Sequence, residues 1–250
     1  MGFPFEVEIK INKKLGVVVL QADETIETEL RKIIPLHCDI YHSRIASDPK
    51  VTPETLKKMI KDLPVAISLF PSEIKFDLIA YACTSGATII GPNRVRNIIN
   101  GTYKGTKVTD PISAVCDALK VLNARRVGFV SPYVQSVSRE IRDFMVTQNF
   151  EIKSLVSFEQ ESETVVASIK EYDTLKAIKE AATQDVDAIF VSCTNLRSFS
   201  ILEEAEAITG KPVLSSNQAL AWGMLRDAKV FMSDKDLEKC PGKIFNREFF

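Results

Sequence analysis

Histidine is scarce in this sequence, with only two residues among 250. With so few histidines, we do not expect a histidine-based metal centre or a catalytic cysteine–histidine pair. An excess of charge is also missing, because 32 Lys and Arg residues face 33 Asp and Glu residues and leave a net charge of −1. With this balance we expect neither nucleic acid nor an anionic membrane surface as a partner.

Long apolar runs are absent as well, and none approaches the ~20 residues that a membrane helix needs. Residues 1–14 lack the basic start, the apolar stretch and the small-residue cleavage site of a secretory signal. The five cysteines are odd in number and contain no Cys-x-x-Cys pair, in a chain large enough to fold without disulfides. These features predict reduced thiols and a cytoplasmic location.

One pattern occurs twice in the chain. Residues 76–86 read FDLIAYACTSG, and residues 186–196 read VDAIFVSCTNL. In both, an Asp precedes a short apolar run, and Cys-Thr follows that run. Such a run predicts a buried strand, so Cys83 and Cys193 each lie just past the carboxyl end of a strand. In open parallel sheets, ligands bind at that end.

The spacing of this pattern predicts two similar halves. Cys83 and Cys193 are 110 residues apart, while Gly16 and Gly128, in a second pair of strand-like segments, are 112 residues apart. Two matched pairs at nearly the same offset indicate two half-molecules that face each other with one cysteine each. The alternative is two unrelated buried strands whose cysteines are small core residues.

Strand-like and helix-like segments alternate along the chain, which predicts an α/β fold with parallel sheets and helices on both faces. We expect residues 1–110 plus 216–250 to form the first half and residues 111–215 to form the second. Residues 100–105, with two glycines, are the best linker candidate. The polar residues 159–164 are expected to form a loop.

Three groups of residues resemble the aspartate/glutamate racemase superfamily, and within it the branch of maleate cis-trans isomerases and arylmalonate decarboxylases. They are YACTSG at 81–86, SPY at 131–133 and SCTN at 192–195, and with the strand order the resemblance covers nearly the whole chain. Residues 20–25 and 90–95 also look similar to a subgroup associated with ectoine utilisation.

The resemblance implies two α/β halves related by pseudo-twofold symmetry, with the active site in the cleft between them. It implies a small carboxylate as substrate and catalysis without metal, nucleotide or pyridoxal phosphate, so we expect no cofactor.

The aromatic and charged segment 245–250 fits a docked terminus or a subunit contact equally well, which leaves a homo-oligomer open.

Two thiols on opposite walls of one cleft suit chemistry at a carbon next to a carboxylate. One thiolate can remove the α-proton while the other thiol delivers a proton to the opposite face, which inverts the centre. In cis-trans isomerisation, one thiolate instead adds to the double bond, permits rotation and leaves again. Either route needs thiolate, and a thiol of pKa ~8.5 is only about 3% ionised at pH 7. We therefore expect backbone N–H groups beside each sulfur to lower its pKa.

The same N–H groups and nearby side chains are expected to hold the substrate carboxylate and its enediolate-like form. The candidate catalytic residues are Cys83 and Cys193. The candidate substrate-binding residues are Glu24, Thr84, Ser85, Tyr133, Thr194 and Asn195.

Departures from the resembling families bear on the reaction. Arylmalonate decarboxylases carry glycine where this chain has Cys83, so the presence of both cysteines argues against decarboxylation. Maleate isomerases carry asparagine where this chain has Glu24, and again where it has Ser162–Glu163. Because an acidic group repels a dicarboxylate and attracts an amine, an amino-acid-like substrate is favoured. The alternative for Glu24 is a helix start that points to solvent, with Asp23 as N-cap.

These considerations predict a cofactor-independent racemase or isomerase that acts on a small, amino-acid-like carboxylate by two-cysteine acid/base chemistry. One alternative is a maleate cis-trans isomerase that works by cysteine addition to the double bond. Another is a non-catalytic protein that binds a small carboxylate on the same scaffold.

Other candidates are weaker. Cys38, Cys116 and Cys240 have no Thr after them and are interpreted as structural. Arg44 and Arg197 are candidates to pair with a second carboxylate of the substrate.

Overall fold

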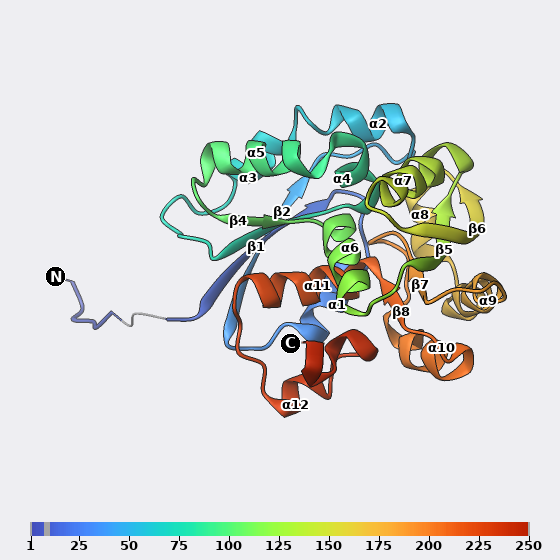
Figure 1. Ribbon diagram of the computed structural model, residues 1–250. Helices are drawn as coiled ribbons and strands as arrows, with labels where there is room; N and C mark the ends of the chain where they lie inside the picture. Colours follow the sequence, from blue (N-terminus) through green and yellow to red (C-terminus); the bar gives the residue numbers. More distant parts are fainter. Residues whose placement is uncertain (1, 8–10, 250) are drawn as a thin grey trace.

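Two parallel sheets stand side by side in the computed structural model, which describes residues 2–7 and 11–249 (Figure 1). The first sheet has the order β2-β1-β3-β4 and the second has the order β6-β5-β7-β8. The two orders are the same when four is added to each strand number, which confirms the expected two similar α/β halves. The strands are β1 (Lys13–Leu20), β2 (Cys38–Ile45), β3 (Leu78–Ala82), β4 (Lys107–Thr109), β5 (Arg126–Tyr133), β6 (Glu151–Gln160), β7 (Ala188–Val191) and β8 (Val213–Ser215).

Helices cover both faces of the sheets (Figure 1). Among the described residues, none of these helices has the length and apolar character of a membrane span. In the first part of the chain they are α1 (Ile26–Ile33), α2 (Pro53–Lys58), α3 (Leu63–Ser68), α4 (Thr84–Ile90), α5 (Pro92–Thr102) and α6 (Pro111–Val121). They continue with α7 (Gln135–Thr147), α8 (Glu163–Ser168), α9 (Glu171–Ala181), α10 (Leu202–Thr209), α11 (Ser216–Asp227) and α12 (Asp234–Leu237). Short 3-10 turns lie at Phe199–Ile201, Lys243–Phe245 and Arg247–Phe249.

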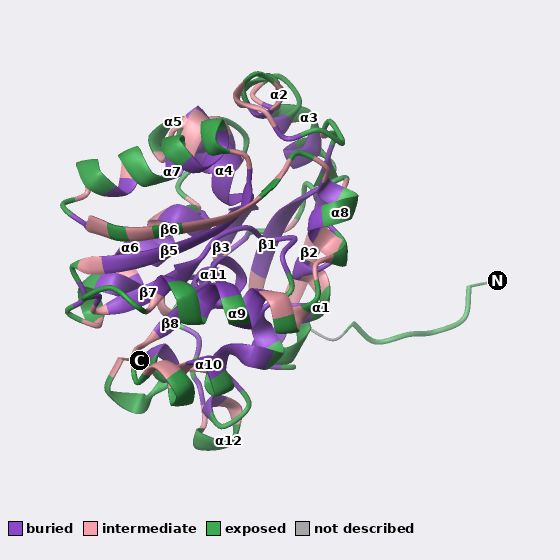
Figure 2. Cartoon of the chain, turned by 90° about the vertical axis from the view of Figure 1, so that its right-hand side faces the viewer, coloured by how far each residue is buried: buried purple, intermediate pink, exposed green. Residues whose placement is uncertain are grey.

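The central strands are apolar along their whole length because helices shield both of their faces. Every residue of β3 and β7 is buried, as Figure 2 shows for the middle of the molecule. β3 pairs in parallel with β1, and β7 pairs in parallel with β5. This arrangement places Cys83 and Cys193 just beyond the carboxyl ends of equivalent strands in the two sheets.

Capping side chains start several helices. The Thr52 hydroxyl accepts a hydrogen bond from the Thr55 N–H in α2, and Asp110 accepts one from the Ser113 N–H in α6. Residues 23–24 were expected to begin a helix, but α1 starts at Ile26. The N-cap residue is Thr25, and Asp23 supports the start of the helix, because its Oδ1 accepts the N–H groups of Thr25 and Ile26 at 2.9 Å each.

Residues 159–164 differ from the predicted loop, since β6 extends through Gln160 and α8 begins at Glu163. A helix of six residues is too short to show an apolar period in the sequence. The segment is also fixed by the other half of the molecule. The Val51 N–H donates to the Glu161 carbonyl at 2.8 Å, and the Glu163 N–H donates to the Pro49 carbonyl at 3.2 Å.

Helix α11 connects the two halves. It follows β8 of the second sheet but packs against β3 and β4 of the first, and also against α1 and α6. Its first residue, Ser216, therefore lies where the carboxyl ends of both sheets meet. The boundaries at residues 110 and 215 remain a prediction.

Candidate active site

The first candidate nucleophile, Cys83, is the N-cap of α4. Its side chain is 3% exposed, and its Sγ accepts a hydrogen bond from the Gly86 N–H at 3.2 Å. The Ser85 hydroxyl lies 3.7 Å from the same sulfur. The apolar strand β3 fixes where the turn begins, and the helix start aims a backbone donor at the thiol.

Gly86 leaves the space that this contact requires. A Cβ at this position would lie 2.7 Å from the Tyr81 hydroxyl oxygen and 2.9 Å from both the Cys83 Sγ and the Met59 Cε. These separations are shorter than van der Waals contact, so any larger residue would displace the sulfur or the buried tyrosine.

The second candidate, Cys193, lies in a strained turn. Its φ of 99° is in the left-handed region that a non-glycine residue rarely adopts. Such strain costs about 1–3 kcal/mol and persists where the surroundings hold it, often at functional sites. The Cys193 Sγ is also buried, and it accepts the Asn195 N–H at 3.2 Å.

A single hydroxyl connects the two cysteine turns. The Ser216 Oγ accepts a hydrogen bond from the Thr84 hydroxyl at 2.8 Å and another from the Cys193 N–H at 3.0 Å. The residue after one cysteine and the backbone of the other therefore meet at the start of α11. Sequence reasoning missed Ser216, although its place directly after a short strand was a usable signal.

Tyr133, the last residue of β5, lies beside Cys193. Its hydroxyl is 2.9 Å from the Cys193 Sγ and 3.0 Å from the Glu163 Oε1. The side chain is buried, and it contacts the thiol and the carboxylate at once. The sequence placed this hydroxyl on the substrate carboxylate, and that role remains a prediction.

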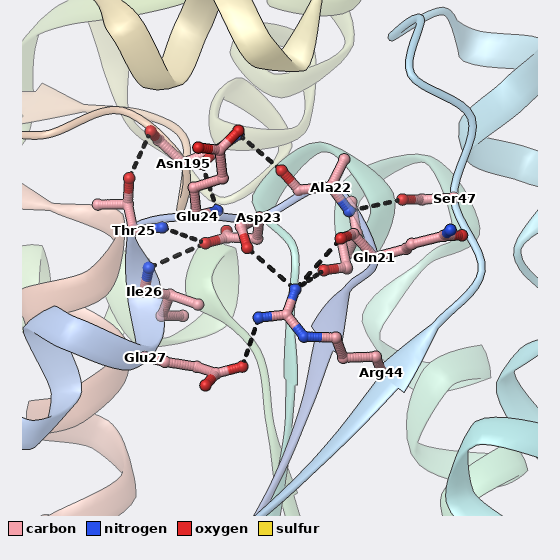
Figure 3. Close-up of polar contacts among 11 residues, drawn as sticks. Gln21, Ala22, Asp23, Glu24, Thr25, Ile26, Glu27, Arg44, Ser47 and Asn195 are labelled. Atoms are coloured by element: carbon pink, nitrogen blue, oxygen red, sulfur yellow. Dashed lines mark hydrogen bonds and ion pairs between the residues drawn. The ribbon is translucent and has the colours of Figure 1, made fainter.

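Asn195 holds parts of both halves together (Figure 3). Its Oδ1 accepts the Glu24 N–H at 2.8 Å, and its Nδ2 donates to the Glu163 Oε2 at 2.9 Å. The Thr25 hydroxyl donates to the Asn195 carbonyl at 2.9 Å. These contacts occupy the amide on both sides, while its predicted contact with substrate remains untested.

The three charged candidates, Glu24, Arg44 and Arg197, have other surroundings than the thiols. The Glu24 side chain is exposed, and the buried carboxylate of this turn is Asp23. Arg44 donates to the Leu20 and Asp23 carbonyls at 3.0 Å each and to the Glu27 carboxylate at 2.6 Å (Figure 3). The guanidinium of Arg197 reaches backbone carbonyls at the end of α8.

The surroundings of both thiols favour the protonated form. Burial raises the pKa of Cys83 to about 12 and raises the pKa of Cys193 well above its ordinary value. The negative charges of Glu163 and Asp23 raise both pKa values further. The backbone donors act in the opposite direction but are outweighed. The expectation of a lowered thiol pKa was therefore wrong.

Glu29 on α1 fixes the turn that follows Cys193. Its Oε2 accepts the Asn217 side-chain amide at 2.7 Å, and that amide also donates to the Thr194 carbonyl at 2.8 Å. Its Oε1 accepts the Phe199 N–H at 3.3 Å. Burial raises the pKa of this carboxyl from 4.5 to about 7.

We expect Glu29→Gln to flatten the pH dependence of stability between pH ~5 and ~8. In the unfolded chain the carboxyl ionises near 4.5, whereas in the folded protein its pKa is about 7. Its stabilising contribution is therefore complete below pH 4.5 and is lost as the pH rises toward 7, a change of about 3 kcal/mol.

Urea unfolding at pH 5 and pH 8 measures this difference. Glu180→Gln, at an exposed position of α9, is the matched control and should keep the wild-type slope. A Glu29→Gln variant with the wild-type slope would show that another group carries the dependence.

The described residues contain no group of three or more His, Cys, Asp or Glu side chains that could hold a metal ion. The chemistry available in the site is that of two thiols, a tyrosine hydroxyl and two carboxyl groups, Asp23 and Glu163. Such a set can donate, accept and exchange protons, and a thiolate formed there can act as a nucleophile.

Comparison with known proteins gives a consistent result. The family model described as arylmalonate decarboxylase matches residues 101–239. The maleate isomerase of Nocardia farcinica is 26% identical over 225 residues, which are 86% of this chain and 89% of that protein. The crystal structure of a maleate isomerase from Pseudomonas putida has a TM-score of 0.83 at 24% identity, and covers 94% of this chain and 99% of its own.

A second solved structure shows a similar fold. It is the maleate cis-trans isomerase of Nocardia farcinica with a covalently bound succinylcysteine intermediate. Its TM-score is 0.80 at 24% identity, and the match covers 87% of this chain and 93% of that one.

Proposed function

Because the chain belongs to the arylmalonate decarboxylase family, in the branch of the aspartate/glutamate racemase-like superfamily that includes the maleate isomerases, we propose that it is an isomerase that inverts a carbon next to a carboxylate. The substrate is a small, amino-acid-like carboxylate, and Cys83 and Cys193 are the acid and the base.

The paired geometry of the two cysteines is the observation that supports this proposal. Each sulfur accepts one backbone N–H, from Gly86 and from Asn195 respectively. The two turns come from equivalent strand ends of different sheets and are linked through the Ser216 hydroxyl. A substrate carbon between two such turns has one proton-transfer group on each face, which inversion requires.

The proton balance of this reaction is simple. The thiolate of one cysteine takes the α-proton and becomes a thiol, and the electron pair of the broken C–H bond moves into the enediolate form of the carboxylate. The thiol of the other cysteine gives its proton to the opposite face and becomes a thiolate. One proton has been removed and one added, so the product differs from the substrate only in configuration.

Cis-trans isomerisation of maleate is the second candidate, and the comparisons favour it. Maleate isomerases match this chain over most of its length. In that reaction a thiolate forms a C–S bond to one alkene carbon, and the electron pair of the broken π bond moves into the enediolate form of the carboxylate on the other carbon. The remaining C–C single bond rotates, the electron pair returns to re-form the π bond, and the C–S bond breaks to release the thiolate. This route also requires a buried cysteine to ionise to the thiolate.

Solvent deuterium separates the two candidates. In deuterium oxide, inversion should place one solvent deuterium on Cα, because the delivered proton comes from a thiol that exchanges with solvent. Addition of a thiolate to maleate should yield fumarate, and this reaction does not require uptake of deuterium. Amino acids, N-acetylated diamino acids and maleate are each incubated with the protein and followed by mass spectrometry, and we expect deuterium uptake into an amino-acid-like compound.

Three results of this screen have different meanings. Uptake into an amino-acid-like compound supports inversion. Fumarate formed from maleate without uptake transfers the assignment to the second candidate. An absence of both reactions across the screen favours a non-catalytic protein that binds a small carboxylate.

A further inference from the structure

We propose that Asp23 and Glu163 together bind a cationic nitrogen group of the substrate, an ammonium or an amidinium, beside the two thiols. The inference rests on the proposed function in one respect, because the cation belongs to the molecule on which Cys83 and Cys193 act. It assigns the recognition of charge to two residues that come from different halves of the chain.

Asp23 presents an unused acceptor in the interior. The residue is 4% exposed, and its Oδ1 is occupied by the N–H groups of Thr25 and Ile26. Its Oδ2 is buried and accepts no hydrogen bond from any described residue. Burial raises the pKa of Asp23, whereas the two backbone N–H groups and the nearby Thr194 hydroxyl lower it. A buried carboxylate oxygen without a donor costs free energy that a ligand donor would recover.

Glu163 is buried to the same degree, at 4% exposure. Its two oxygens accept hydrogen bonds from the Tyr133 hydroxyl and the Asn195 amide, which are both neutral groups. Neutral donors orient a carboxylate but leave its charge uncompensated. The backbone bond from the Glu163 N–H to the Pro49 carbonyl fixes the residue against the first half of the molecule.

No cationic side chain of the described residues pairs directly with either carboxyl group. Neither Asp23 nor Glu163 takes part in any ion pair within that part of the chain. Arg44 is the cation that acts on Asp23, but its guanidinium binds the Glu27 carboxylate and backbone carbonyls (Figure 3). Over residues 2–7 and 11–249, no cation acts on the pKa of Glu163.

The acidic groups and the thiols lie close enough for their charges to interact. Burial raises the pKa of Glu163 most, and the charge of Asp23 raises it further. Burial likewise dominates the raised pKa values of Cys83 and Cys193, to which the charges of both carboxylates add. Two acidic side chains and two thiols are therefore buried near one another, and no described residue forms an ion pair with either carboxyl group. A dianionic ligand would add negative charge to this region, whereas an ammonium or amidinium would neutralise it.

Binding of a cation here would also assist catalysis. The charges of Asp23 and Glu163 are part of what keeps both thiols protonated. A positive group placed between them offsets that effect and lowers the pKa of each thiol. The substrate would then promote the ionisation of the cysteine that removes its proton, while the unliganded protein keeps its thiols neutral.

Matched pairs of ligands test the inference without knowledge of the natural substrate. Alanine and 2-methylpropanoate differ only in an ammonium that replaces a methyl group, and so do aspartate and methylsuccinate. In calorimetric titrations of the wild-type protein, we expect the ammonium member of at least one pair to bind at least ten times more tightly than its methyl partner.

The variants Asp23→Asn and Glu163→Gln keep the shape of each side chain and remove its charge. Each should reduce the preference for the ammonium member, and the double variant should abolish it. Asn at position 23 can still accept the two backbone N–H groups that start α1. Glu161→Gln, at an exposed position two residues from Glu163, is the control and should keep the wild-type preference.

Several results would overturn the inference. They are equal or tighter binding of the methyl members, no binding of either ammonium member at millimolar concentration, or a preference that survives in the folded double variant. Titration measures binding alone, so it remains informative if no deuterium uptake is found and the proposed inversion fails. Deuterium uptake into methylsuccinate as fast as into aspartate would reject cation recognition and leave the proposed inversion intact.

Discussion

Replacing either Cys83 or Cys193 with serine should reduce turnover at least ~10³-fold, within the range that positioned acid/base groups contribute. A serine hydroxyl is a far weaker acid than a thiol, so it can neither ionise to act as the base nor readily deliver the second proton. The reaction needs one group on each face of the substrate carbon, and neither cysteine can replace the other. Deuterium uptake by the best compound of the substrate screen measures the loss.

The remaining cysteines provide matched controls. Cys38, Cys116 and Cys240 are buried among apolar side chains, and burial raises the pKa of each thiol. Alanine at Cys38 or Cys116 should change turnover less than about threefold, because neither sulfur lies in the candidate site. Full activity in Cys83→Ser or Cys193→Ser would exclude the two-cysteine mechanism.

A single methyl group at position 86 should damage both stability and activity. In Gly86→Ala, the new Cβ would lie 2.7 Å from the Tyr81 hydroxyl oxygen and 2.9 Å from the Cys83 Sγ. Relief of such overlap in a packed interior costs about 1–3 kcal/mol. It also moves the sulfur away from the N–H that now donates to it at 3.2 Å. A displacement of about 1 Å can reduce turnover ~10²-fold.

Gly101→Ala is the control for this change. Gly101 lies in α5, and an alanine Cβ there would meet no atom within 4 Å, so this substitution should stabilise the protein by about 0.4–1 kcal/mol. Urea unfolding and deuterium uptake, measured on both variants, separate stability from activity. A Gly86→Ala protein with wild-type stability and turnover would show that the turn after Cys83 tolerates a larger residue.

The carboxyl-terminal ends of β3 and β7 show how far the sequence could predict the site. Each strand is a short apolar run between an Asp and a Cys-Thr pair, and both are buried and parallel to a neighbour as predicted. A strand that is buried on both faces has an almost continuous apolar sequence, so its burial can be predicted from composition. The placement of Cys83 and Cys193 at strand ends follows from these local patterns alone.

The partners of the two sulfurs were harder to predict. The contact between Tyr133 and Cys193 spans 60 residues, and that between Tyr133 and Glu163 spans 30. Glu163 was placed in a loop because the helix that carries it has only six residues. In the acidic turn after β1 the sequence favoured Glu24, while the structure buries Asp23 instead. Which of two adjacent carboxylates points inward depends on the path of the chain after the strand.

Local sequence patterns were enough to specify the two similar α/β halves and the strand ends at which Cys83 and Cys193 lie, because apolar runs and capping residues act within a few positions of the chain. The state of the thiols, in contrast, is set only once the chain has folded. Their pKa values depend on burial and on the charges of Asp23 and Glu163, which reach the site from different halves. Desolvation is a property of the packed interior, and no local pattern of residues encodes it.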